Sequence, residues 1–125
     1  MVGQLLYVGL GGFFGAICRF LVAKYTANTL GAFPVGTLLV NVTGSFVLAF
    51  ISYSVLQGKD IPVDFRSFMT IGFIGAYTTM STFSYESMRF FDQGEYAYFF
   101  LNLLLNIGLC FGAVILGRMC AMMFK

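Results

Sequence analysis

Residues 72–86 read GFIGAYTTMSTFSYE and lie in the middle of an otherwise apolar run. They hold two glycines and five hydroxyl-bearing Thr and Ser side chains. In hydrocarbon, an irregular backbone persists only where protein or water covers its unpaired N–H and C=O groups. The stretch predicts a helix that breaks near the midplane of a membrane, at Gly75 to Thr78. Ser81 and Thr82 are then expected to cap the helix where it resumes. The alternative is an intact helix, bent by Thr and Ser hydroxyls that bond to carbonyls one turn earlier.

The composition places this stretch in an integral membrane protein. Of the 125 residues, 59% are hydrophobic and 10% are charged, whereas a soluble domain carries about 25% charged residues. Bilayer-spanning helices need roughly 20 apolar residues, and segments of this kind cover residues 2–23, 34–56, 65–91 and 96–124. The sequence therefore predicts an all-α membrane protein with a single transmembrane domain, 1–125, and four transmembrane helices, the third of them broken.

Basic residues are almost balanced between the two sides of the membrane. An even number of spans puts both termini on one side, with Lys59, Arg66, Arg118 and Lys125, and leaves Arg19, Lys24 and Arg89 on the other. The Lys and Arg asymmetry between short loops sets orientation, so four against three is a weak instruction. Insertion both ways would permit an antiparallel two-fold dimer. The alternative is that a single charge fixes one orientation.

Uncharged polar side chains share faces of two predicted spans. Thr37 and Asn41 are one turn apart in the second span, as are Asn102 and Asn106 in the fourth. Taken alone, such amides are commonly contacts between helices. They also suit the route of a small anion, because a full positive charge would trap it. Phe83, which follows the break, can turn the positive edge of its ring towards an anion.

The break also offers charge partners for ions. Carbonyls released between Gly75 and Thr78 would suit a small dehydrated cation, and two copies meeting there could surround one ion such as Na⁺. Arg19 is expected either to snorkel to the interface or to raise the potential of a water-filled vestibule. Glu86, one turn beyond Phe83, is expected either at the interface or as a competitor for the donors when no anion is present.

The chain has few of the residue types that catalytic sites use. It has no His, no Trp and five acidic residues. The three cysteines, Cys18, Cys110 and Cys120, are isolated and lack the spacing of a metal site. The sequence therefore predicts a protein that is not an enzyme, and whose partners are lipid, an ion and itself rather than nucleic acid.

Small residues recur at the spacing that lets helices approach closely. Gly11 and Gly15 form a GxxxG pattern in the first span, and Gly108 and Gly112 form another in the fourth. Within lipid the hydrophobic effect does not drive helix association, so close backbone contact takes its place. These glycines predict a tight bundle and name no function.

Three motifs resemble the signatures of the Fluc family of fluoride channels, in the same order: GGFFGAICRF at 11–20, GTLLVNVTGSFVL at 36–48 and GFIGAYTTMSTFSYE at 72–86. The resemblance covers nearly the whole chain. It implies a dual-topology, antiparallel homodimer with two pores that conducts F⁻ passively and selectively out of the cytoplasm. It further implies protection against fluoride toxicity and a place in the bacterial inner (plasma) membrane.

The same resemblance implies roles for individual residues. Backbone carbonyls of Gly75 and Thr78 would hold one structural Na⁺, the only cofactor, at the dimer centre. The remaining assignments are Asn41 and Phe83 in the pore, Ser81, Thr82 and Glu86 at polar positions around them, and Arg19 near the vestibule. Thr37, on the Asn41 face, completes the candidate anion residues.

Met80 departs from the family pattern, because it stands in the pore where the resemblance implies the first of two phenylalanines, Phe83 being the second. That pattern resembles TTFSTFS, whereas residues 78–84 read TTMSTFS. Methionine is flexible and polarizable but has no ring edge to present to an anion. Because Met roughly conserves apolar volume, we expect slower or altered permeation with the fold intact.

Two other functions fit the composition. A small dual-topology multidrug/proton exporter would need a membrane-embedded carboxylate, but the first and second spans contain none and Glu86 lies towards an end of the third. A non-transporting membrane assembly subunit would explain the glycines, but it would leave Asn41 and the broken helix without a purpose.

Overall fold

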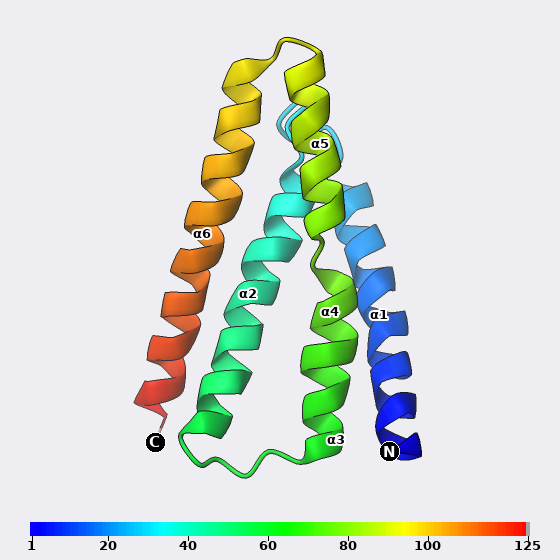
Figure 1. Ribbon diagram of the computed structural model, residues 1–125, viewed down its shortest axis with the longest axis vertical. Helices are drawn as coiled ribbons and strands as arrows, with labels where there is room; N and C mark the ends of the chain where they lie inside the picture. Colours follow the sequence, from blue (N-terminus) through cyan, green and yellow to red (C-terminus); the bar gives the residue numbers. More distant parts are fainter. Residues whose placement is uncertain (125) are drawn as a thin grey trace.

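The computed structural model describes residues 1–124. Lys125, which the sequence places among the basic residues at one end, lies outside the described residues. The described chain consists of helices and their connections: α1 (Val2–Thr26), α2 (Val35–Leu56), α3 (Val63–Arg66), the π-helical turn η1 (Ser67–Phe73), α4 (Ile74–Tyr77), α5 (Met80–Asp92) and α6 (Tyr96–Met123) (Figure 1).

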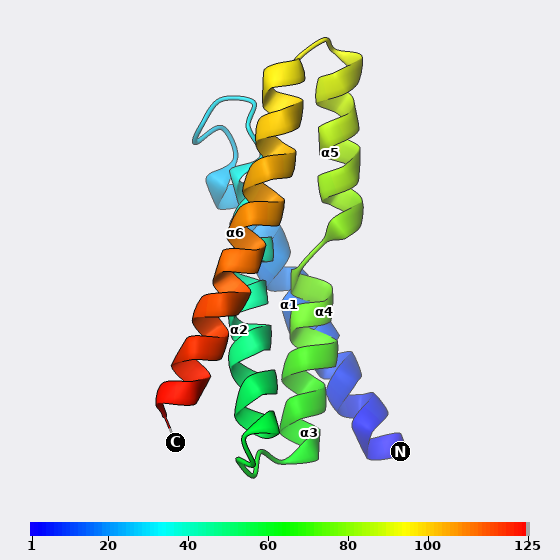
Figure 2. The same ribbon diagram turned by 60° about the vertical axis from the view of Figure 1, so that its left-hand side comes forward.

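The path of the chain is that of a multi-pass membrane protein. Helices α1, α2 and α6 are each long and apolar enough to cross a membrane. The predicted third span is present as the run from α3 to α5, whose members follow one another along the long axis (Figure 2). Both termini and the 57–62 connection lie at the same end of the molecule, as an even number of crossings requires (Figure 1).

Backbone contact between glycines joins α1 to η1. A Cβ on Gly15 would meet the carbonyl carbon of Phe73 at 2.9 Å, and one on Gly72 would meet the carbonyl oxygen of Val8 at 2.5 Å. Both distances are too short for a real Cβ, so these positions admit only glycine at this helix separation. The packing role predicted for the first GxxxG pattern is confirmed.

The second GxxxG pattern does not pack within the chain. Around both Gly108 and Gly112, no atom of another segment in residues 1–124 lies within 4 Å of the place a Cβ would take. The glycine of α6 that does touch α2 is Gly117, where a Cβ would meet the carbonyl oxygen of Phe46 at 2.5 Å. Tight packing at Gly108 and Gly112 is therefore wrong for the single chain, because the neighbouring helix contacts another face of α6.

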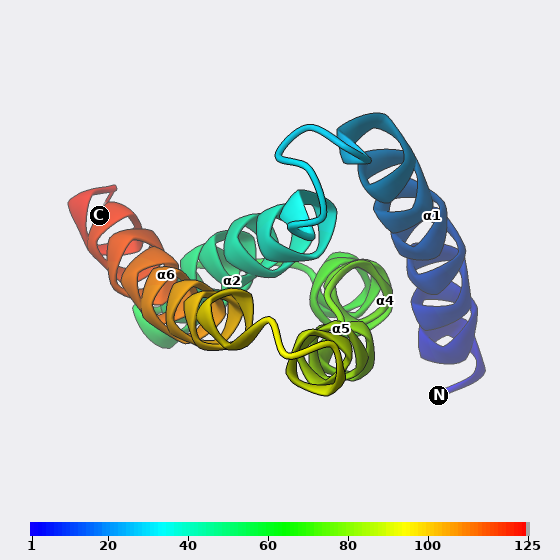
Figure 3. The same cartoon turned by 90° about the horizontal axis from the view of Figure 1, so that it is seen from above.

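The helices form an open arrangement rather than a closed bundle. Seen from above, α1 and α6 lie at opposite edges, with α2, α4 and α5 between them (Figure 3). Large apolar side chains remain on the outside, including Leu104 (70% exposed) and Phe111 (69% exposed). In water this surface would be costly to leave uncovered. In a bilayer, lipid tails or another apolar helix cover it.

Candidate functional site

The third predicted span is broken, so the alternative prediction of an intact, bent helix is wrong. Helix α4 ends at Tyr77, Thr78 has an extended backbone (φ −83°, ψ 157°), and Thr79 is also extended (φ −152°, ψ 114°) before α5 begins at Met80. The break lies at Thr78–Thr79, slightly beyond the predicted Gly75 to Thr78. Gly75 is wrong as part of the break, because it still lies within α4.

Thr79, rather than Ser81 or Thr82, caps the resumed helix. The Thr79 hydroxyl accepts the backbone N–H of Thr82 at 3.2 Å, which is the geometry of an N-cap. The capping role predicted for Ser81 and Thr82 is therefore wrong, since both residues already belong to α5. The sequence signal for the correct cap was a Thr directly before the first helical residue.

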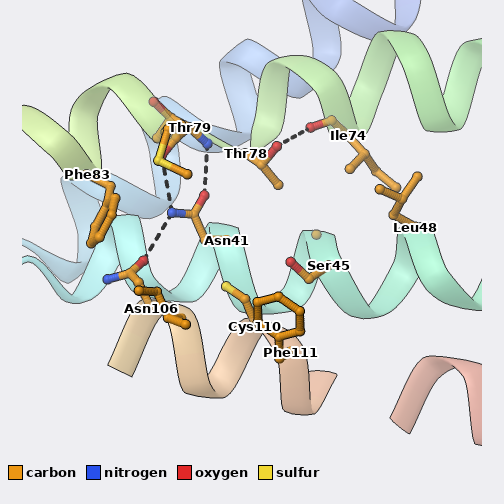
Figure 4. Close-up of a pocket in the computed structure, with 13 residues that line it drawn as sticks. Asn41, Ser45, Leu48, Ile74, Thr78, Thr79, Phe83, Asn106, Cys110 and Phe111 are labelled. Carbon is orange, nitrogen blue, oxygen red and sulfur yellow. Dashed lines mark hydrogen bonds between the residues drawn. The ribbon is translucent and has the colours of Figure 1, made fainter. Parts of the chain in front are cut away.

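Asn41 of α2 takes the place of the helical hydrogen bonds that the break removes. Its Oδ1 accepts the N–H of Thr79 at 2.8 Å, and its Nδ2 donates to the carbonyl oxygen of Thr79 at 3.2 Å (Figure 4). The same Nδ2 donates to Oδ1 of Asn106 at 3.1 Å. Asn41 thus binds both backbone groups of one residue at the break and ties them to α6.

Two backbone carbonyls at the break lose their helical donors. In an unbroken helix the oxygen of Gly75 would accept from the N–H of Thr79, and that of Thr78 from the N–H of Thr82. The first amide is bound by Asn41 and the second by the Thr79 hydroxyl. The described residues contain no group of His, Cys, Asp or Glu that could hold a metal. Oxygen ligands of the kind left by Gly75 and Thr78 fit a small hard cation.

Arg19 of α1 turns towards the break. Its Nε donates to the carbonyl oxygen of Ala76 at 3.0 Å, in a partly buried position. Arg19 therefore contacts the backbone of α4 directly before the break. The guanidinium lies at the C-terminal end of α4, where the peptide dipoles favour a positive charge.

A cavity of about 300 Å³ opens beside the break, between α2, α4, α5 and α6. Asn41, Thr79 and Asn106 supply polar groups to its wall, and Phe83 and Cys110 also line it (Figure 4). Phe83 is buried, with 8% of its surface exposed. Met80 also lines this cavity, but 73% of its surface is exposed, so no other part of the chain covers most of its side chain.

Two smaller cavities lie on the other side of the break. One of about 160 Å³ is lined by Thr37 and Glu86, among others, and one of about 50 Å³ by Arg19, Thr37 and Thr82. The Thr37 hydroxyl donates to Oε1 of Glu86 at 2.6 Å, while Oε2 of Glu86 is buried without a hydrogen-bond partner. In this structure the Thr37 hydroxyl, predicted to bind an anion, donates its hydrogen bond to Glu86 instead.

The candidate residues therefore divide into two groups around the break. Asn41, Met80 and Phe83 share the large cavity, whereas Arg19, Thr37, Thr82 and Glu86 line the smaller ones. Ser81 is exposed, and its hydroxyl lies 3.3 Å from that of Thr79. Sequence reasoning missed Ser87, whose Oγ accepts a hydrogen bond from Asn102 at 2.9 Å. Its signal was a Ser one turn after Phe83.

The sequence matches known proteins over nearly its whole length. Residues 6–118 match the family described as CrcB-like protein, Camphor Resistance (CrcB). A protein of Methanococcus maripaludis named Fluoride-specific ion channel FluC is 47% identical over 97% of this chain and 98% of its own length. A Campylobacter lari protein of the same name is 45% identical over 94% and 96% of the two chains. One from Methanocaldococcus jannaschii is 43% identical over 98% and 97%. The resemblance to the Fluc family is confirmed, and the chain belongs to the CrcB-like family of membrane proteins.

Proposed function

We propose that this protein is a passive ion channel selective for fluoride. The observation that carries the proposal is its full-length similarity to proteins named fluoride-specific ion channels, 47% identical over 97% of this chain in one case. Those relatives are channels, and the chain is not an enzyme. The proposal places it in the bacterial inner membrane, where fluoride efflux would protect the cytoplasm from fluoride toxicity.

Uncharged hydrogen-bond donors support an anion route. Fluoride is small and strongly hydrated, so its water must be replaced by close donors that release it again. Hydroxyls of Thr37, Ser81 and Thr82 are the proposed donors, and Arg19 raises the local potential near them. Because Glu86 accepts a hydrogen bond from the Thr37 hydroxyl, this route requires that hydrogen bond to break when fluoride binds.

The large cavity continues the proposed route. Asn41, Phe83 and Met80 border it. The ring of Phe83 would present its positive edge to the anion. Met80 provides a polarizable but weaker surface at the position where the family resemblance implies a second ring.

We further propose that two copies pair antiparallel and form two pores. The support is a surface without a partner in the described part of the chain. Gly75 is exposed, and a Cβ on Gly108 or Gly112 would have no other segment of residues 1–124 within 4 Å. Met80 and Phe111 line the large cavity and are themselves mostly exposed. A second copy seated there would wall the cavity, and the two-fold axis would repeat it. Near-balanced basic residues permit the opposed insertion that this requires.

The proposed cofactor is a structural Na⁺ on the dimer axis. The carbonyl oxygens of Gly75 and Thr78 from both copies would hold it, because their helical donors are bound elsewhere. When bound, the ion supplies positive charge that offsets the converging carbonyl dipoles. Exchange of Na⁺ for a large organic cation should lower the thermal stability of the dimer, and an unchanged melting temperature would remove this part of the proposal.

The test of the main proposal is ion release from liposomes that contain the purified protein. A fluoride-selective electrode should record rapid fluoride efflux down its gradient, and a chloride electrode should record little. Transport driven by a proton gradient would instead favour the drug/proton exporter. An absence of fluoride efflux from well-folded protein would favour the assembly subunit.

A further inference from the structure

A chain of hydrogen bonds between buried and partly buried side chains runs from the large cavity to the backbone of α5. Nδ2 of Asn41 donates to Oδ1 of Asn106 at 3.1 Å, and Nδ2 of Asn106 donates to Oδ1 of Asn102 at 2.9 Å. Nδ2 of Asn102 then donates to Oγ of Ser87 at 2.9 Å. The Ser87 hydroxyl donates to the carbonyl oxygen of Phe83 at 2.7 Å. The chain therefore ends on the backbone of the residue whose ring lines the same cavity.

The outer members of this chain are buried away from the cavity. Asn102 is 0% exposed and Ser87 is 3% exposed, and neither lines the described cavities. A buried amide is costly unless its polar groups are paired, and here the pairing is provided by the chain itself. Asn102 and Ser87 are thus placed to act on the cavity only through other residues.

Asn102 decides which end of the Asn106 amide faces the cavity. Nδ2 of Asn106 donates both to Oδ1 of Asn102 and to its backbone oxygen, at 2.9 and 3.0 Å. With its nitrogen held on that side, Asn106 must present its oxygen to Asn41. Asn41 then donates to that oxygen and to Thr79, and so stays on the break. A flip of Asn106 would oppose two NH₂ groups and release Asn41.

We propose that Asn102 and Ser87 are positioning residues for the ion route, because they orient Asn106 and thereby hold Asn41 on Thr79 and Phe83 on the cavity wall. The functional part rests on the proposed channel activity. The hydrogen bonds all run in one direction, so each donor strengthens the next and the orientation is set cooperatively.

The decisive variant is Asn102→Leu, which keeps a similar volume and removes both side-chain hydrogen bonds. Fluoride efflux per folded protein should fall by about tenfold or more, the effect of losing a buried hydrogen bond and leaving its partner unpaired. The amide of Thr79 should exchange its hydrogen with solvent faster, because Asn41 no longer holds it. Asn102→Asp in its neutral form can accept from Asn106 and donate to Ser87, so it should recover most of the efflux.

Ile51→Ala is the matched control. Ile51 is buried in α2, with 7% of its surface exposed, and lines none of the described cavities. This variant should lower stability but leave efflux per folded protein and exchange at Thr79 unchanged. If Asn102→Leu yields too little folded protein, Ser87→Ala should move both measurements in the same direction by a smaller factor.

Two results would overturn the inference. One is wild-type efflux and wild-type exchange at Thr79 in Asn102→Leu; the other is an equal loss in Ile51→Ala. An absence of fluoride efflux from the unaltered protein would instead refute the channel proposal. Exchange at Thr79 would still show whether Asn102 holds the break.

Discussion

Replacement of Asn41 by Asp exchanges one NH₂ group for a carboxylate oxygen and changes the volume of the side chain very little. The carboxylate can still accept the N–H of Thr79, but it has no hydrogen to give to the carbonyl oxygen of Thr79 or to Oδ1 of Asn106. These two oxygens lie 3.2 and 3.1 Å from the present nitrogen. In Asn41→Asp a negatively charged oxygen would face both of them at that distance.

The magnitude follows from the two lost donors. Each buried acceptor left unpaired costs about 1–3 kcal/mol, so together they cost about 2–6 kcal/mol before any charge repulsion. A typical domain is stable by about 5–15 kcal/mol, so the fold survives in weakened form. The proposed anion route fares worse, because a fixed negative charge beside Phe83 repels fluoride. We therefore expect measurable folded protein with almost no fluoride efflux.

The assay combines fluoride-electrode efflux from liposomes with thermal unfolding of the same preparation. Asn28→Asp is the matched control, since it makes the same chemical change at an exposed residue with φ 64°, a conformation that Asp also tolerates. This control should keep wild-type stability and efflux. Full efflux and full stability in Asn41→Asp would refute the reasoning about the clamp and the anion route together.

Three further substitutions test other parts of the structure. Gly15→Ala should destabilise the protein by about 1–3 kcal/mol, because a Cβ there collides with the backbone of η1, whereas Gly3→Ala, with nothing within 4 Å, should not; equal melting temperatures for the two would contradict this. Met80→Phe adds a ring edge at the mouth of the large cavity and should raise fluoride efflux, and unchanged efflux would mean that a ring there is dispensable. Arg19→Lys keeps the charge but loses the Nε–H that donates to the carbonyl oxygen of Ala76, so it should reduce fluoride efflux. Wild-type efflux in this variant would mean that Arg19 contributes only its positive charge.

The sequence alone determined the membrane-spanning helices and the presence of a break in the third span. Long apolar runs with few charges predict membrane-spanning helices. In lipid, a helix satisfies all its backbone hydrogen bonds within one segment. Helices α1, α2 and α6 accordingly begin and end within a few residues of the predicted bounds. The weak helical stretch after Gly72 was also enough to predict a break, since glycines and hydroxyl side chains give the backbone alternatives to the helix.

Only the tertiary structure decided where that break lies and what surrounds it. The N–H of Thr79 leaves the helix because its partner is Asn41, 38 residues earlier in the chain. The bond between Thr37 and Glu86 spans 49 residues. Local patterns contain no information about partners at such separations. For the same reason two GxxxG patterns of equal spacing differ in their packing. The η1 turn packs against Gly11 and Gly15, whereas no other helix within residues 1–124 reaches Gly108 or Gly112.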